Sequence, residues 1–134
     1  MSTILVDNLT GKTSAGSITV TSEGGAATQS LQQGLAKAWA CFVQDTSHTF
    51  HDSFNCSSLT DGGAGFSSTS YTNSFSNDDY SSTGMAGKAS NRLFIDSVGD
   101  AGKDSTGQQL YVSNASGTGT DGDDCNVTCH GDLA

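Results

Sequence analysis

Residues 48–75 read HTFHDSFNCSSLTDGGAGFSSTSYTNSF, and this stretch decides the fold class. Two runs that contain Thr, Phe and Tyr flank the cluster DGGAG at residues 61–65. Aromatic and β-branched residues favour strands, whereas clustered Gly and Asp favour turns. The stretch is therefore predicted to form two short strands joined by a turn.

The same alternation continues on both sides of this stretch. KAWACFVQ precedes it, and ASNRLFIDSV, QQLYVSNAS and CNVTCHG follow it. Six or seven short strands with turn signals every ~8–12 residues are typical of an all-β sandwich or barrel. We expect residues 37–134 to form an antiparallel, jelly-roll-like β-sandwich. Its predicted core consists of Trp39, Phe42, Phe50, Phe54, Leu59, Tyr71, Phe75, Leu93, Ile95, Leu110, Val112 and Val127.

Residues 1–27 are predicted to form an N-terminal arm. Two short β-prone runs, Thr3 to Val6 and Ser17 to Thr21, are separated by a polar stretch. Neither run is long enough to have its own core, and an isolated hairpin is at best marginally stable in water. We expect sister chains or a docking surface to order this arm.

Residues 28–36 are predicted to form one or two helical turns. Leu31, Leu35 and Ala38 recur at helical spacing, so they would line a short seam between chains. Gly34 weakens a helix, and an irregular linker is the alternative.

The composition indicates an oligomer and excludes some partners. Ser, Thr and Gly make up 54 of the 134 residues, and apolar residues make up only 34%. A monomer of this composition buries little apolar surface, a shortage that oligomerisation relieves. The net charge of −9 argues against nucleic acid and anionic membranes as partners, because binding phosphates requires basic surfaces.

No stretch of the sequence predicts insertion into a membrane. No apolar run approaches the ~20 residues of a membrane span, and the start MSTILVDNLTGK lacks the pattern of a signal peptide. We therefore expect the protein to be made in the cytoplasm.

His48, His51, Asp52 and Cys56 resemble a metal or catalytic cluster at first sight. Successive side chains of a strand point to opposite faces, so His48 and His51 would be separated by the sheet. We therefore interpret the cluster as part of an ordinary strand. The alternative is a metal site between subunits, in which three copies of one histidine converge.

The four cysteines are interpreted as free thiols. Cys125 and Cys129 would lie ~13 Å apart along a strand, too far for a disulfide. Pairing of Cys41 or Cys56 with one of them in an oxidising environment stays an alternative.

The acidic loops and the glycine-lysine pairs provide weak evidence for a site. The loops around Asp78 and Asp79 and around Asp121, Asp123 and Asp124 could hold calcium, but they lack the full loop signature. GMAGKAS and GDAGKDS lack the pattern of a phosphate-binding loop, and G-x-S-x-G is absent. We expect no catalytic residue, no cofactor and no bound metal.

Several motifs resemble one family. MSTILVDNLTGKTSAGSITV is similar to N-termini that run M-S-x-[IL]-x-V-D-x-[IL]-x-G-K-T-x-A-G, in small tail-fibre or head-fibre-type minor structural proteins of marine and cyanobacterial tailed bacteriophages. LQQGLAKAWACFVQ resembles LQQGLAKAWVNFNG, and DSFNCSSLTDGGAG resembles DSFNVSSITDNGTG. SFSNDDYSSTG stands where the family has F-x-x-x-M-P-D-A-N-Y, without its proline, and CNVTCHGDLA stands in the place of the last strand.

The resemblance implies a trimeric, non-enzymatic virion protein whose arm attaches it to other virion proteins. The expected partners are sister chains, tail, portal-proximal or capsid proteins, and a host surface glycan or receptor. A capsid decoration protein is the alternative, followed by a glycan-cleaving enzyme.

Three groups of residues are expected to carry these contacts. Ile4, Val6, Ile18 and Val20 would anchor the chain to the virion, and Leu31, Leu35 and Ala38 would form the seam. Host contact is expected at Tyr71, Tyr80 and Tyr111, and at the loops of residues 62–66, 99–107 and 116–124, because loops on a rigid scaffold often carry recognition.

Overall fold

The computed structural model describes residues 3–45, 47–89, 91–97 and 102–134, and only the backbone of residues 91–94, 96 and 97. The chain divides into two compact units, Met1–Leu35 and Ala36–Ala134. The predicted β domain begins at residue 37, next to this division.

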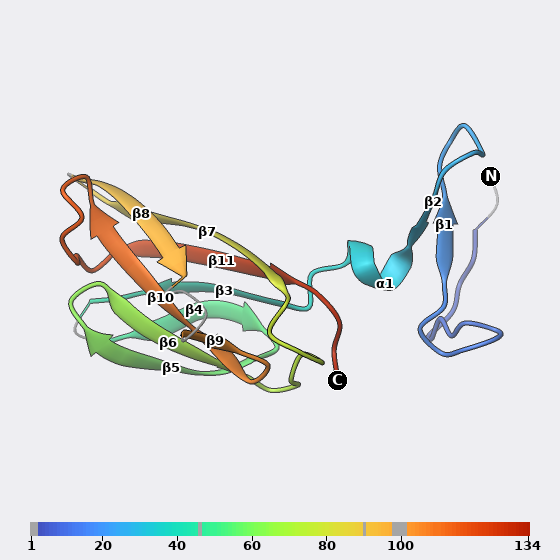
Figure 1. The fold of residues 1–134 in the computed structure, drawn as a ribbon, viewed down its shortest axis with the longest axis horizontal. Helices are drawn as coiled ribbons and strands as arrows, with labels where there is room; N and C mark the ends of the chain where they lie inside the picture. Colours follow the sequence, from blue (N-terminus) through green and yellow to red (C-terminus); the bar gives the residue numbers. More distant parts are fainter. Residues whose placement is uncertain (1–2, 46, 90, 98–101) are drawn as a thin grey trace. The chain divides into compact units, whose positions relative to one another are not determined.

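The N-terminal unit contains a short hairpin and one helical turn (Figure 1). β1 (Thr19–Thr21) pairs antiparallel with β2 (Thr28–Ser30). α1 (Leu31–Gly34) follows directly, and the side chain of Ser30 caps it by accepting a hydrogen bond from the Gln33 N–H at 3.4 Å. No residue of the described range 3–35 is buried.

Two expectations for this unit need correction. Residues 3–6 form no strand, and the predicted helical segment 28–36 contains only the four residues of α1. The Ser22 N–H donates to the Ala27 carbonyl at 2.8 Å, and this turn folds residues 28–30 back onto β1. Helix nucleation is costly in so short a segment, so strand pairing prevails.

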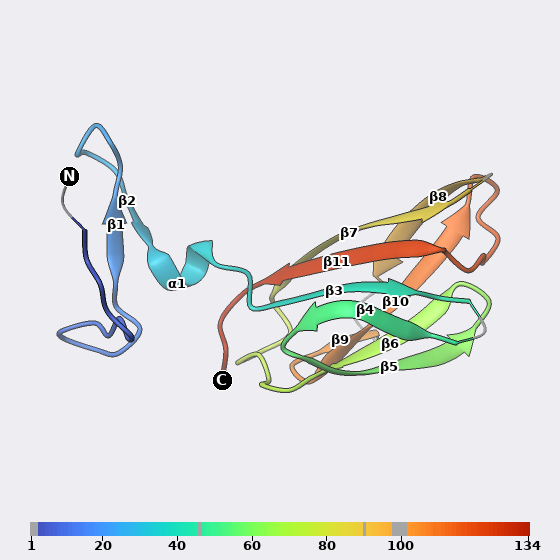
Figure 2. The same ribbon diagram turned by 180° about the vertical axis from the view of Figure 1, so that it is seen from behind.

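The second unit is built from antiparallel strands, which confirms the all-β prediction. Figures 1 and 2 show its strands from two sides. The strands are β3 (Ala38–Val43), β4 (Thr49–Phe54), β5 (Cys56–Gly63), β6 (Phe66–Tyr71), β7 (Ser81–Lys88), β8 (Asn91–Ser97), β9 (Lys103–Asp104), β10 (Gly107–Asn114) and β11 (Asp124–His130).

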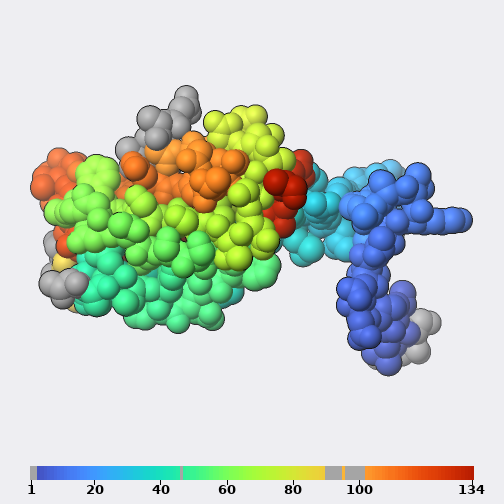
Figure 3. All heavy atoms as spheres, turned by 90° about the horizontal axis from the view of Figure 1, so that it is seen from below, coloured from blue at the N-terminus to red at the C-terminus, as the bar shows by residue number. Residues whose placement is uncertain are grey.

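The strands follow one continuous hydrogen-bonded path. Its order is β4-β3-β11-β7-β8-β10-β6-β5, and β9 pairs with β10 outside this path. Seven residue pairs join β11 to β7, and β7 pairs with β8 at Gly87 with Arg92 and at Lys88 with Asn91. One group of strands, β4-β3-β11-β7, therefore meets the other, β8-β10-β6-β5, where β7 pairs with β8. Figure 3 shows the surface that β4, β5 and β6 (teal to green) form on one side.

One core joins the two groups of strands. Ala38, Ala40 and Phe42 of β3 are buried in the same cluster as Leu110 and Val112 of β10. Along β11, Cys125, Val127 and Cys129 are buried and alternate with half-buried Asn126 and Thr128, as expected for a strand with one face toward a core.

Half of the predicted core residues are fully buried. Phe42, Tyr71, Phe75, Leu110, Val112 and Val127 are buried, and Trp39, Phe50, Leu59 and Ile95 are partly buried. Phe54 is a wrong prediction, because its side chain is 52% exposed. The side chain of Leu93 lies outside the described residues. The predicted list omitted the buried residues Ala38, Ala40, Tyr80, Cys125 and Cys129.

A buried glutamine links β3 to two other segments. The Gln44 carboxamide donates to the Gly65 carbonyl at 3.1 Å and to the Ser67 hydroxyl at 2.8 Å. It also accepts a hydrogen bond from the Gly122 N–H at 3.1 Å. The side chain is fully buried and its polar atoms are satisfied, so it fixes the β5–β6 turn and the loop before β11 to the end of β3.

Candidate functional site

The histidine-rich stretch does not form one site. His48 precedes β4 at φ 36°, and its Nδ1 lies 3.0 Å from the Asp45 carbonyl oxygen. Its Nε2 lies 3.6 Å from a carboxylate oxygen of Asp61. His51 is exposed in β4, where the pairing with β3 is shifted by one residue. The described residues contain no group of three or more His, Cys, Asp or Glu side chains placed to hold a metal ion.

The expected geometry of this stretch also needs correction. His48 lies in a turn and not in the strand, so strand alternation is not what separates it from His51. Phe50 is partly buried, whereas Asp52 and Phe54 are exposed, because the shifted register at His51 changes which residues face the core.

All four cysteines are free thiols. Burial raises the pKa of Cys56 to about 11 and that of Cys125 to about 12, from an ordinary value of 9.0. Cys129 Sγ lies 3.5 Å from the Tyr71 hydroxyl and 3.3 Å from Gln108 Nε2. The Cys56 and Cys125 thiols are therefore protonated at neutral pH, and the buried Cys125 and Cys129 side chains pack as small core residues.

The acidic loop before β11 is held by internal contacts. An Asp121 carboxylate oxygen accepts a hydrogen bond from the Gly65 N–H at 2.7 Å. The Lys88 ammonium donates to the Asp121 carbonyl at 2.9 Å and lies 3.9 Å from the Asp123 carboxylate. In the loop before β7, Asp78 and Asp79 are exposed. These contacts join Asp121 to the backbone of Gly65 and join Asp121 and Asp123 to Lys88.

The residues expected to form the oligomer seam lie in different units. Leu31 is partly buried, and Leu35 is 55% exposed in the N-terminal unit. Ala38 lies in β3 and is fully buried in the core of the other unit. Ala38 therefore cannot line a surface seam, and this part of the prediction is wrong.

The four predicted anchor residues all belong to the N-terminal unit. Ile4 is 83% exposed, Val6 and Val20 are also exposed, and Ile18 is partly buried. Val20 also lines a shallow hollow of about 180 Å³ beside Leu31 and Leu35.

Of the three tyrosines expected to contact a host, two are buried. Tyr71 and Tyr80 pack in the core, where each forms an aromatic contact with Phe75, and the Tyr80 hydroxyl donates to the Gly107 carbonyl at 2.9 Å. The prediction is wrong for both, because a buried ring cannot meet a partner. Burial also raises the pKa of Tyr71. Of the predicted contact loops, residues 98–101 lie outside the described residues.

Tyr111 is partly exposed and forms a pair with Phe66. The two residues are cross-strand partners on β10 and β6, and their ring centroids lie 4.5 Å apart. The Tyr111 hydroxyl donates to the Gly117 carbonyl at 3.2 Å, which fixes the ring against the turn after β10.

A second accessible surface is formed by β4, β3, β11 and β7. The strand register places Phe54, Trp39, Thr128 and Thr83 in one row across the four strands. Asp52, Cys41, Asn126 and Met85 form the neighbouring row. None of these eight side chains is buried, and they project on the side of the sheet away from the core. We call this surface the outer face.

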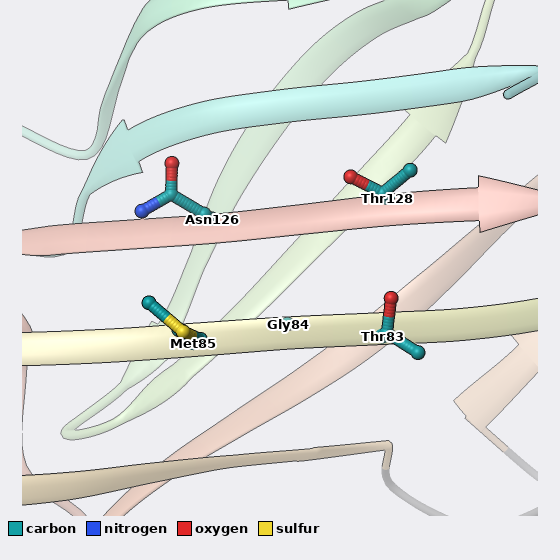
Figure 4. Close-up of a pocket in the computed structure, with 5 residues that line it drawn as sticks. All are labelled: Thr83, Gly84, Met85, Asn126 and Thr128. Carbon is teal, nitrogen blue, oxygen red and sulfur yellow. The ribbon is translucent and has the colours of Figure 1, made fainter.

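The outer face contains a hollow between β11 and β7 (Figure 4). Asn126 and Thr128 project from β11, and Met85 and Thr83 project from β7 on either side of Gly84. The hollow measures about 240 Å³. The sequence showed that Asn126 and Thr128 alternate with apolar residues, but it did not show that Thr83 and Met85 lie beside them.

Comparisons with known proteins return no match. No protein-family model, no curated protein and no solved structure matches the chain. The resemblance to phage structural proteins therefore stays a prediction from the sequence motifs. In the part of the chain that the structure describes, no helix has the length and apolar character needed to span a membrane.

Proposed function

We propose that the chain is a non-enzymatic structural protein of a bacteriophage virion. Its N-terminal unit would attach it to the particle, and its second unit, interpreted as a jelly-roll-like β-sandwich, would face the host cell as part of a homotrimeric fibre or appendage. The motifs of the phage family support this role.

The observation that carries the proposal is the contrast between the two units. Residues 38–129 provide all the buried apolar side chains of the core cluster, and none of the described residues 3–35 is buried. Ile4, Leu5, Val6, Leu9, Val20 and Leu35 are instead exposed. Exposed apolar groups gathered in one segment are typical of a surface that a partner covers.

The hairpin itself gives a second reason to expect a partner. Only three residue pairs join β1 to β2, and a two-stranded hairpin is marginally stable in water. Burial of large apolar side chains contributes about 1.5–3 kcal/mol each, so a virion surface that covers them would order this unit.

Incorporation into particles tests the attachment. We expect a variant with Ile4→Asn and Leu5→Asn to fold normally but to be lost from purified particles by at least about tenfold, because two apolar contacts are removed. Phe66→Asn, which replaces an exposed apolar side chain of the β domain, is the matched control. Equal incorporation of both variants would refute attachment through the N-terminal unit.

The number of copies per particle separates the fibre from capsid decoration. The exposed N-terminal unit suits attachment to a tail or to a shell. A few trimers at one vertex would identify a fibre, whereas hundreds of copies distributed over the capsid would identify a decoration protein.

A further inference from the structure

We propose that the hollow on the outer face binds a neutral oligosaccharide, an inference that rests on the proposed role in host adsorption. The ligand would lie over β11 and β7 between Asn126 and Met85, with Trp39 of β3 beside it. The polar and apolar groups of the hollow, the charge around it and the size of the face support this assignment.

The hollow combines hydrogen-bonding groups with an apolar wall. The hydroxyls of Thr83 and Thr128 have no hydrogen-bond partner in the described part of the chain. Met85, which is 73% exposed, supplies an apolar side chain beside them (Figure 4). A sugar has hydroxyl groups at its edge and C–H groups on its face, so it complements such a mixed surface.

Asn126 is held in a fixed orientation at the edge of the hollow. Its Nδ2 donates to an Asp124 carboxylate oxygen at 3.1 Å. The same oxygen lies 3.8 Å from Cys41 Sγ. The side-chain carbonyl of Asn126 can therefore accept a hydrogen bond from a ligand without first losing rotational freedom, which favours binding.

The charge of the outer face favours a neutral ligand. The two rows contain the carboxylate of Asp52 and lie beside that of Asp124, and they contain neither lysine nor arginine. The whole chain has a net charge of −9. An anionic or sulfated sugar would be repelled, and a phosphate would find no cation to pair with.

The size of the face argues against a second copy of the chain as its occupant. Four strands ~4.8 Å apart and about six residues of ~3.3 Å each cover about 400 Å². A stable protein interface needs about 800 Å² from each partner, and two copies of this face would bring their acidic groups together. A small ligand in the hollow needs no such area.

A titration of the ¹⁵N-labelled full chain tests the proposal. The probes are maltohexaose, mannohexaose and chitohexaose, with a heparin hexasaccharide as the anionic comparison. We expect at least one neutral sugar to shift the amide signals of residues 83–85 and 126–128. Asn126→Ala and Thr128→Val should each weaken that binding by about 3- to 10-fold, the effect of losing one hydrogen bond.

Thr60→Val is the matched control for Thr128→Val, because Thr60 is an exposed threonine on β5, outside the outer face. It should leave sugar binding unchanged. The proposal is overturned if no neutral sugar shifts these amides, if only the heparin fragment does, or if Thr60→Val weakens binding while Asn126→Ala does not. A chain that enters particles but binds no sugar would refute this inference alone, and not the attachment of the N-terminal unit.

Discussion

Gly84 shows how closely a single residue can control the packing of this domain. A Cβ atom at this position would lie 2.6 Å from the Asn126 carbonyl oxygen and 2.9 Å from Ile95 Cγ2. We therefore expect Gly84→Ala to lower the free energy of unfolding by about 1–3 kcal/mol, the usual cost of overpacking. Urea denaturation followed by tryptophan fluorescence would measure it.

Gly87→Ala is the control for this prediction, because it changes the same residue type in the same strand. Its Cβ would meet the Asp124 carbonyl oxygen at 3.7 Å, an ordinary contact. This variant should be neutral or slightly more stable, since alanine reduces the conformational entropy of the unfolded chain. Equal destabilisation by the two substitutions would contradict the packing argument.

The buried thiols predict how stability changes with pH. The pKa values of Cys56 and Cys125 are raised to about 11 and about 12, so the folded chain holds these protons more tightly than the unfolded chain, whose thiols titrate near 9.0. The resulting stabilisation is complete below pH 9 and is lost as the pH rises through the folded values. The free energy of unfolding should therefore fall between pH 9 and pH 11.

Cys125→Ala separates this effect from the titration of lysines and tyrosines. The variant should be less stable at neutral pH because it leaves a cavity, but its stability should fall less steeply above pH 9. Urea titrations at pH 7, 9, 10 and 11 provide the comparison. An unchanged slope would mean that the Cys125 thiol does not contribute.

At the scale of elements, the two hairpin strands and the strands of the core should differ in stability. β1 and β2 share three residue pairs and no buried side chain, whereas β11 shares seven pairs with β7 and five with β3. Amide hydrogen exchange should therefore be fast in β1 and β2 and slow in β3, β10 and β11. If the amides of β1 and β2 were as protected as those of β3, β10 and β11 in the purified protein, the hairpin would be stable without a partner.

The sequence predicted β3, β6, β8, β10 and β11, but it missed β7 and treated β4 and β5 as one strand. KAWACFVQ and CNVTCHG became β3 and β11, because the apolar run of the first and the alternation of apolar and polar residues in the second are local properties. Phe54 was predicted to be in the core but is exposed, since the shifted register at His51 depends on how β4 pairs with β3. Residues 28–30 were predicted to be helical but form a strand, because they pair with the preceding strand β1.

At the scale of the whole molecule, the oligomeric state can be tested with the two units. The second unit contains the core cluster, so residues 36–134 should fold alone. We expect light scattering after gel filtration to find the full chain as a trimer and residues 36–134 as a monomer, because the exposed apolar side chains lie in the N-terminal unit. A stable, folded monomer of the full chain would contradict the proposed trimer.

The candidate site depended even more on tertiary structure than the fold did. Tyr71 and Tyr80 were predicted to meet a host on the basis of residue type, but they are core residues. Asn126, Thr128, Thr83 and Met85 belong to strands that are about forty positions apart in the sequence. No local pattern in the sequence joins them.

The sequence by itself determined the all-β class, the acidic charge and the contrast between a weak N-terminal segment and a β domain, because composition and strand periodicity are local properties. Only the tertiary structure decided the strand order, the role of Gln44 and the hollow of the outer face. The physical reason is that hydrogen-bonded strand partners are distant in sequence, and the register between them selects the side chains that share a surface.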